Sequence, residues 1–271
     1  MLGADVSSPG VLNIEDLRSR AKNRLPAMVF NYIDSGADRE QTLSQNCNAY
    51  NEILFRPRCA VSVPSCDLGI SVLDQKFQLP FLLGPVGSSR MFYPQGEVVA
   101  AREAGKAGTG YTLSTLSGCL LEDVKAATNG PAWYQLYLLG GKEVALKTIA
   151  RAKEAGFSAI VVTIDTPVSG LRERDMRSGT QQLLSMNPLE MLPYIPQILV
   201  KPCWLTQWLS DGGLMSFPNV QLDDGPMGYT AIGPALEQSV VTWEDLQWIR
   251  EAWGGKIIVK GIHIGLSLIH I

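Results

Sequence analysis

Residues 159–165 read Ala-Ile-Val-Val-Thr-Ile-Asp, a continuous apolar run that ends in polar side chains. Unalternating runs of this length are typical of strands buried on both faces, as in a parallel sheet. Four further runs have the same character, at residues 81–85, 111–114, 133–137 and 256–261. We therefore predict five buried strands that belong to one parallel sheet.

Helical patterns fill the intervals between these runs, at residues 96–107, 119–127, 142–155 and 242–253. In the third of them Thr148, Ile149 and Ala152 share one face, as in an amphipathic helix. In the last, Thr242 and Asp245 have the spacing of a capping box at a helix start. The chain therefore alternates strand and helix.

This alternation predicts an α/β fold, a (β/α)₈ TIM barrel preceded by an N-terminal helical region at residues 13–37. Only about five of the eight β-α units of such a barrel fit within the sequence. We expect a partial domain over residues 1–262, with open sheet edges. Residues 263–271 continue neither a helix nor a strand pattern, and we interpret them as a truncation scar.

Composition narrows the class of protein. The 271 residues are 46% hydrophobic and 18% charged, enough apolar material for one large core. A net charge of -3 and a pI of about 5.5 argue against nucleic acid as a partner, which needs a clustered basic surface. Five cysteines without a CxxC pair or a nearby histidine predict reduced thiols and no metal site. No signal-peptide pattern opens the chain, so we expect a cytoplasmic protein.

An apolar segment, residues 186–225, interrupts the alternation and is expected to be an inserted loop. Its most hydrophobic part, residues 186–209, contains four prolines and so does not suit a spanning helix, which needs about 20 mostly apolar residues. Tyr194, Trp204, Trp208 and the leucine and isoleucine residues of this stretch would suit a membrane interface. Two interpretations stay open: peripheral contact with the inner face of the membrane, and a loop that is folded over the protein or disordered.

The carboxyl ends of the strands are where β-α barrels place their chemistry. In this chain those positions carry hydrogen-bonding and charged side chains, namely Ser114, Gln135, Tyr137, Thr163, Asp165 and Lys260. A single Ser or Thr at such a position is explained as the cap of the following helix. A Gln, a Tyr, an Asp and a Lys converging on one rim are not, so we predict a functional site there.

The same positions belong to a set of segments that carries a family resemblance from Asn13 to Ile262. These segments, in chain order, are Leu25-Pro26, Tyr32, Ser35-Gly36-Ala37, Phe55-Arg56-Pro57-Arg58, Gly84-Pro85-Val86-Gly87, Pro94-Gln95-Gly96-Glu97, Thr112-Leu113-Ser114, Gln135-Leu136-Tyr137, Thr163-Ile164-Asp165-Thr166-Pro167, Arg172-Glu173-Arg174-Asp175, Thr242-Trp243-Glu244-Asp245-Leu246 and Val259-Lys260-Gly261. Together they make the chain resemble the FMN-dependent α-hydroxy-acid oxidoreductases, the family of glycolate oxidase, L-lactate dehydrogenase (cytochrome) and mandelate dehydrogenase.

The resemblance implies FMN as cofactor and the oxidation of an (S)-2-hydroxy acid, such as lactate, glycolate or mandelate, to a 2-oxo acid. It places Pro85, Val86 and Gly87 beside the flavin. Three other residues would form hydrogen bonds with the flavin ring, namely Ser114, Gln135 and Thr163. Lys260 would lie near N1 and the C2 carbonyl, where a cation stabilises the anionic reduced ring.

The resemblance also assigns the substrate. Tyr32, Tyr137 and Arg172 would hold its carboxylate, with the guanidinium supplying paired donors. Asp165 would orient a histidine base and stabilise its charged form. The electron acceptor, whether a quinone, a cytochrome or oxygen, is left open, and a homotetramer is implied for the full-length parent protein.

One departure from the family concerns the base itself. Members carry a His-Gly-Gly-Arg-like motif at the sixth strand and later segments that bind the FMN phosphate. Neither follows in this sequence, whose only histidines are His263 and His270. We therefore expect the 271-residue chain to be catalytically inactive. Another flavin or phosphate-binding barrel, such as a type 2 isopentenyl diphosphate isomerase, is the alternative, but the paired tyrosines and Arg172 suit a carboxylate better.

Two substitutions bear on the subtype. Gly87 stands where oxidases of the family often have Ala, and Leu116 stands where glycolate oxidase has Trp. A small residue beside the flavin and an aliphatic one over the substrate favour a dehydrogenase of the mandelate type, with a pocket for a bulkier side chain.

Overall fold

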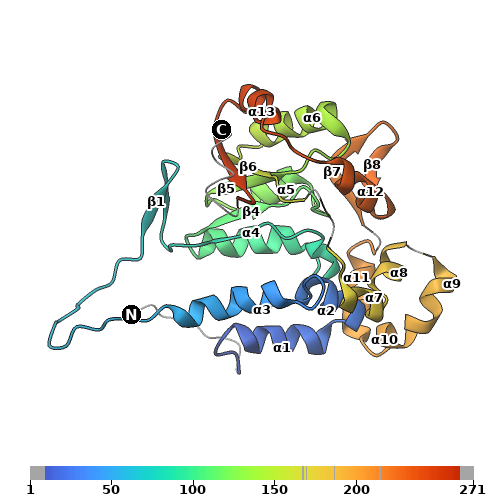
Figure 1. The fold of residues 1–271 in the computed structure, drawn as a ribbon, viewed down its shortest axis with the longest axis horizontal. Helices are drawn as coiled ribbons and strands as arrows, with labels where there is room; N and C mark the ends of the chain where they lie inside the picture. The colour runs from blue at the N-terminus through green and yellow to red at the C-terminus, as the bar shows by residue number, and fades with distance from the viewer. Residues whose placement is uncertain (1–9, 167, 169, 186, 214, 263–271) are drawn as a thin grey trace.

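A five-stranded parallel sheet forms the centre of the protein, of which the computed structural model describes residues 10–166, 168, 170–185, 187–213 and 215–262. Its strands, in sheet order, are β3 (Leu82–Leu83), β4 (Gly110–Leu113), β5 (Ala132–Leu136), β6 (Ala159–Thr163) and β9 (Lys256–Lys260) (Figure 1). The five predicted strands are confirmed, and their order in the sheet follows their order in the chain. The interpretation of residues 263–271 lies outside the described residues.

Helices cover one face of this sheet. They are α4 (Gly96–Lys106), α5 (Leu121–Ala126), α6 (Gly141–Glu154) and α13 (Asp245–Trp253), and each agrees with a predicted helix. The last begins three residues later than expected. Its capping box forms as predicted, with Thr242 N donating to Asp245 Oδ2 at 2.8 Å and Asp245 N donating to Thr242 Oγ1 at 3.4 Å. A parallel sheet with helices after its strands makes the chain part of an α/β barrel.

Side chains along each strand point alternately to the two faces of the sheet. The face away from the covering helices is called the inner face here. Tyr134, Leu136 and Ile160 point toward the helices and join the main core with residues of α4, α5, α6 and α13. Trp133 and Val161, one position along, pack together on the opposite face. Because side chains of a strand alternate between faces, the polar residues at the carboxyl ends also lie on this inner face.

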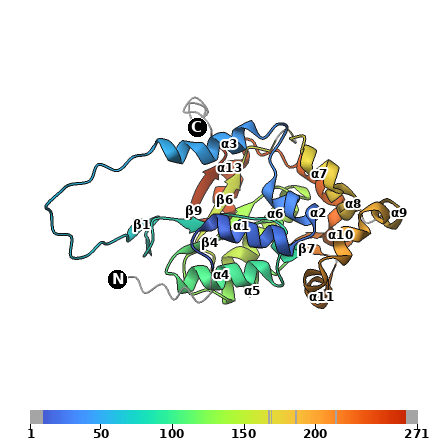
Figure 2. The same ribbon diagram turned by 90° about the horizontal axis from the view of Figure 1, so that it is seen from below.

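The N-terminal helical region is confirmed as α1 (Ile14–Arg24) and α2 (Ala27–Asp34), followed by α3 (Gln41–Asn48) and the short turn η1 (Ala49–Glu52). Asn13 and Asp16 form a capping box at the start of α1. Figure 2, seen from below, draws α1 and α2 in front of the strands, and Figure 1 shows that these helices lie below the sheet and apart from it. An exposed extended stretch leads from η1 to an antiparallel hairpin of β1 (Ile70–Val72) and β2 (Gln75–Phe77), which the sequence patterns did not predict.

The segment expected to be an inserted loop is instead built largely from short helices. It contains α9 (Pro188–Met191), η3 (Leu192–Tyr194), α10 (Ile195–Leu199) and α11 (Pro202–Ser210), preceded by α7 (Glu173–Ser178) and α8 (Thr180–Ser185). Prolines occupy the first turn of α9, α10 and α11, where the missing N–H costs nothing. They therefore start short helices here, in agreement with the expectation that the stretch forms no spanning helix.

After α11 the chain forms a second antiparallel hairpin, β7 (Ser216–Leu222) with β8 (Gly225–Gly228), and then η4 (Tyr229–Ala231) and α12 (Ile232–Gln238). Two aromatic residues of α11 face inward. Trp204 is buried, donates Nε1 to the carbonyl of Met91 at 2.9 Å and stacks on Trp208 with ring centroids 5.5 Å apart. Across the described part of the chain, no helix has the length and apolar character needed to cross a membrane.

Candidate active site

A row of hydrogen bonds joins the carboxyl ends of three neighbouring strands. Gln135 at the end of β5 accepts from the hydroxyl of Ser114 at 3.3 Å and donates Nε2 to the hydroxyl of Thr163 at 3.0 Å. The backbone N–H of Thr115 also donates to Gln135 Oε1, at 3.2 Å. All three side chains of the row are buried. The structure thus brings Ser114, Gln135 and Thr163 together, although the strands are far apart in sequence.

Lys260 continues this row at the end of β9. Its backbone pairs with Thr163 in the sheet register, and its Nζ lies 3.4 Å from Asp165 Oδ2. Both side chains stay accessible, with 43% of Lys260 and 25% of Asp165 exposed. The following residue, Gly261, has a φ of +106°, and a Cβ there would lie 2.5 Å from Asp165 Cβ. Glycine is therefore required for the chain to pass Asp165.

The loop after β3 approaches the same row from the side. Its Ser88 N donates to the carbonyl of Leu116 at 2.8 Å. A Cβ on Gly87 would lie 3.2 Å from Leu116 Cβ and 3.8 Å from Ser114 Oγ, so this glycine lets the two loops come close. Pro85 and Val86 precede it in the same loop, and the Val86 side chain is exposed. The predicted flavin-side residues thus lie beside Ser114.

Three phenols converge next to this loop. Burial raises the pKa of Tyr137, and negative charge on Asp165 and on Tyr32 raises it further. Burial likewise raises the pKa of Tyr32 and of Tyr229, while the nearby Ser88 hydroxyl lowers both. Tyr32 and Tyr229 line the same cavity, and Tyr137 and Tyr229 pack against the same apolar cluster. The predicted pair of tyrosines is therefore together, joined by a third from η4.

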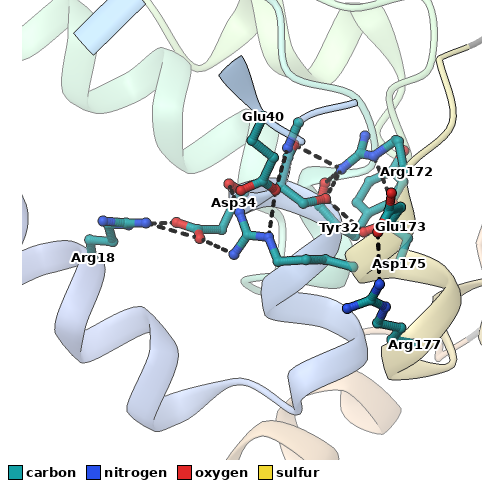
Figure 3. A network of polar contacts seen from close by, with 11 residues as sticks. Arg18, Tyr32, Asp34, Glu40, Arg172, Glu173, Asp175 and Arg177 are labelled. Carbon is teal, nitrogen blue, oxygen red and sulfur yellow. Dashed lines mark hydrogen bonds and ion pairs between the residues drawn. The ribbon is translucent and has the colours of Figure 1, made fainter. Parts of the chain in front are cut away.

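Arg172 reaches Tyr32 from the start of α7 (Figure 3). Its guanidinium carbon lies 5.3 Å from the centre of the Tyr32 ring, and Nη2 donates to the Tyr32 carbonyl and, at 2.8 Å, to the Ser35 hydroxyl. Nε lies 2.8 Å from Asp175 Oδ2 without the alignment of a hydrogen bond. Within the described residues Nη1 has no such partner, which leaves it for a ligand.

A charged network anchors this part of α7 to α2 (Figure 3). Arg174 donates to Asp34 Oδ2 at 2.9 Å and to Glu40 Oε1 at 2.6 Å, and Arg18 donates to Asp34 Oδ1 at 2.5 Å. The hydrogen bond from Arg18 is the largest cause of the lowered pKa of Asp34. The network ties α2, which carries Tyr32, to the first turn of α7, which follows Arg172.

Glu97 joins two of the loops next to the hydrogen-bonded row. It is fully buried at the start of α4, and its Oε1 accepts from Ser89 N at 3.0 Å and from Gly118 N at 3.3 Å. The thiol of Cys119 donates to its Oε2 at 3.3 Å. One carboxyl group thus ties the loop after β3 to the loop after β4, and burial raises its pKa.

The Glu97→Gln variant is expected to lose less stability than wild type as pH rises from about 5 to about 8. A raised pKa in the folded state means that folding favours the protonated carboxyl, so wild type loses stability as pH rises through that pKa. The amide keeps an oxygen for the two N–H donors and does not ionise. Urea unfolding at several pH values measures the effect; an unchanged pH slope would contradict it.

Taken together, these features define a partial α/β barrel whose strand ends carry a hydrogen-bonded polar row, a lysine–aspartate pair and an arginine over a tyrosine. The chain belongs to the FMN-dependent dehydrogenase family, which matches residues 21–265. FMN is therefore the cofactor of its family.

Curated relatives agree with the family. The chain is 38% identical to an L-lactate dehydrogenase of Allorhizobium ampelinum, covering 91% of this chain and 65% of that protein. It is 35% identical to a putative L-lactate dehydrogenase of Mycobacterium tuberculosis, over 93% of this chain and 59% of that protein. The chain thus spans about two thirds of the length of such relatives.

Solved structures give the same result for the fold. A monotopic membrane protein, (S)-mandelate dehydrogenase, superposes with a TM-score of 0.83 at 29% identity, over 93% of this chain and 67% of that one. A mandelate oxidase variant superposes with a TM-score of 0.72 at 27% identity, over 96% of this chain and 64% of that one. The partial-barrel prediction is confirmed.

Sequence reasoning did not select Ser88, Asp175 or Tyr229. Ser88 directly follows the predicted Gly87, and Asp175 lies one turn after Arg172, so proximity in sequence was a signal for both. Tyr229 had no such signal in the sequence, because the second hairpin, which it follows, is what brings it to the site.

Proposed function

We propose that the chain provides the flavin and substrate-binding part of an enzyme that oxidises an (S)-2-hydroxy acid to a 2-oxo acid. The observation that carries the proposal is the convergence of the Ser114–Gln135–Thr163 row and Lys260 on one face, beside Gly87. Bound FMN would accept the two electrons that leave the substrate. The oxidation also releases two protons, one from the hydroxyl group and one from C2.

The residues present fit such a cofactor. The ring edge of a flavin needs both donors and acceptors, and hydroxyl groups such as those of Ser114 and Thr163 can serve as either. Gly87 lacks a side chain that would stand between the loop backbone and the ring. Lys260 Nζ, still partly exposed, supplies a positive charge at the end of the row. These are the residues that would hold FMN.

Tyr32, Tyr137 and Arg172 would bind the substrate carboxylate. Nη1 of Arg172, which has no hydrogen-bond partner among the described residues, would supply a charge-assisted donor, and the two phenols would supply O–H donors that burial keeps protonated. Asp165, between Tyr137 and Lys260, would stabilise a cationic base next to C2. Gly87 and Leu116 support a pocket of the mandelate type.

The test is carboxylate binding to the FMN-loaded protein. Pyruvate, a 2-oxo acid, should perturb the flavin absorption spectrum, and Arg172→Gln should weaken its binding about 10–100-fold, since a hydrogen bond to a charged group contributes roughly 1.5–3 kcal/mol.

Arg177→Gln is the matched control, because Arg177 lies on the same helix, is 78% exposed and pairs only with Glu173 in the described structure. The proposal fails if pyruvate binds wild type and Arg172→Gln equally well.

We also propose that α9–α11 contact a membrane surface. The segment exposes Leu189, Leu199 and Val200, and the structural neighbour named above is described as monotopic. Of the side chains that the sequence suggested for such a contact, Trp204 faces inward, whereas Leu189 and Leu199 are exposed. An exposed aliphatic surface binds an interface through buried apolar area.

The double variant Leu199→Glu/Val200→Glu is expected to bind anionic liposomes about tenfold or more weakly than wild type in co-sedimentation. The reason is that two apolar side chains are no longer transferred from water into the membrane on binding. The control replaces Leu54 and Val63, which lie outside the segment and are at least as exposed as Leu199 and Val200, by Glu. Equal loss of liposome binding in both double variants would show that α9–α11 is not the membrane-contacting surface.

A further inference from the structure

A cavity of about 430 Å³ lies between the end of α1 and the start of α11 and shares no lining residue with the proposed active site. Three cationic side chains line it, those of Arg20, Arg24 and Lys201, and its described lining includes no carboxylate. The volume falls within the range of roughly 300–1,000 Å³ that is usual for small-molecule sites. The charge of the lining therefore favours an anionic ligand.

The surrounding structure holds Arg24 in place without neutralising it. Its guanidinium carbon lies 4.8 Å from the centre of the Tyr93 ring, and Nη2 donates to Gln207 Oε1. Neither of these partners is a carboxylate. Nε is buried without a hydrogen-bond partner among the described residues, so part of the donor capacity of this cation is unused. A cation that is already positioned loses little side-chain freedom when it binds an anion.

Lys201 and the first turn of α11 (Pro202–Ser210) add further donors. Lys201 Nζ donates to the carbonyl of Asn23 at 2.5 Å, which ties this side chain to α1 and leaves two of its three N–H donors. Lys201 is also the N-cap residue of α11, and no side chain caps this helix end. The first N–H groups of a helix have no acceptor within it, and those of Cys203 and Trp204 line the cavity wall. Such a helix start favours a phosphate group.

We propose that this cavity binds a phosphate group, carried by the headgroup of an anionic phospholipid or by a small soluble phosphate ester. A phosphate offers several acceptor oxygens, which match charged donors that converge from two helices. Leu199 and Val200 directly precede Lys201 and are exposed, and Val200 lines the cavity. A lipid headgroup held here would therefore place its acyl chains beside the aliphatic surface of α9–α11. The phosphate site does not depend on the proposed oxidation.

Two variants of the FMN-loaded, 271-residue protein test the site. Arg24→Gln and Lys201→Gln each remove one cation from the cavity wall. Lys22→Gln is the matched control, because Lys22 is an exposed cation in the last turn of α1 that does not line the cavity. All three variants change the net charge equally. Thermal unfolding verifies that each is folded, and Lys201→Gln carries the test if Arg24→Gln unfolds.

The first arm is a calorimetric titration with glycerol 3-phosphate in a buffer free of phosphate. Wild type is expected to bind this ester, and both cavity variants should bind it about tenfold more weakly, because each has lost a charge-assisted donor. Lys22→Gln should stay within about twofold of wild type, since exposed charges away from the site are screened by salt. Glycerol, which lacks the phosphate, should bind to none of them.

The second arm compares phosphatidylcholine vesicles with and without phosphatidylglycerol in co-sedimentation. If the phosphate belongs to a lipid, phosphatidylglycerol strengthens the binding of wild type, and both cavity variants lose about fivefold of this gain while Lys22→Gln keeps it. The double variant Leu199→Glu/Val200→Glu should instead weaken binding to both kinds of vesicle. The comparison thus separates the headgroup site from the proposed apolar contact.

A loss that is confined to the two cavity variants supports the site in either arm, and the arm identifies the source of the phosphate. The inference is overturned if wild type neither binds glycerol 3-phosphate nor prefers vesicles with phosphatidylglycerol. It is also overturned if Lys22→Gln loses as much as the cavity variants, because net charge then explains the effect. Pyruvate binding, which the cavity variants should leave unchanged, reports separately on the proposed function.

Discussion

The Lys260→Met variant is expected to bind FMN about 10–100-fold more weakly than wild type, because a charged donor to the flavin edge contributes roughly 1.5–3 kcal/mol. Lys260 ends β9 next to Thr163, on the inner face with Gln135, and its ammonium group is partly exposed. Quenching of FMN fluorescence on titration with protein measures the dissociation constant. The loss should be in affinity, with little change in thermal stability.

Lys256→Met is the matched control. It removes the same charge from the other end of the same strand, where Lys256 pairs with the exposed Asp74 at 2.8 Å. Exposed ion pairs of this kind contribute about 0–1 kcal/mol to stability, so the Lys256→Met variant should fold like wild type. Its FMN binding should stay unchanged, because Lys256 lies at the opposite end of β9 from Lys260. If the two variants lose FMN equally, net charge explains the effect, and the placement of the flavin beside Lys260 is wrong.

The second large effect concerns turnover. The 271-residue chain, supplied with FMN, is expected to oxidise lactate, glycolate and mandelate at least about 10²–10⁴-fold more slowly than a full-length relative, the contribution of a general base alone. Its sequence carries no His-Gly-Gly-Arg-like motif, and Asp165 is paired with Lys260 where the family resemblance implies a histidine. Anaerobic bleaching of the flavin absorption by each acid measures the rate.

Photoreduction of the same sample serves as the control, because it shows that the bound flavin can be reduced. Bleaching by any of the three acids at a rate near that of a relative would show that a base lies within this chain. His263 would then be the first residue to replace, as His263→Asn. Persistent inactivity after addition of a chain that supplies the motif would instead argue against the proposed substrate class.

Local patterns were sufficient for the sheet and its helices. The run at 159–163 and its four counterparts specify buried strands, and a helical pattern lies in each interval between them, so a parallel α/β arrangement follows. Short strands without a buried apolar run, such as β1 and β2, give no such signal. The prolines of residues 186–209 argued correctly against a spanning helix but did not reveal the short helices α9 to α11, because a proline at the first turn of a helix and one within a loop look alike in sequence.

The sequence by itself determined which residue types stand at the strand ends, because a strand of fixed period and polarity places every second side chain on a given face. It therefore specified Ser114, Gln135, Thr163 and Lys260 as neighbours once the sheet was parallel. Only the tertiary structure decided that Tyr229 joins Tyr32 and Ser88, and that α12 closes a cavity beside Arg172. The reason is that these contacts join segments about 60 to 200 residues apart through packing of whole hairpins and helices, which no local periodicity encodes.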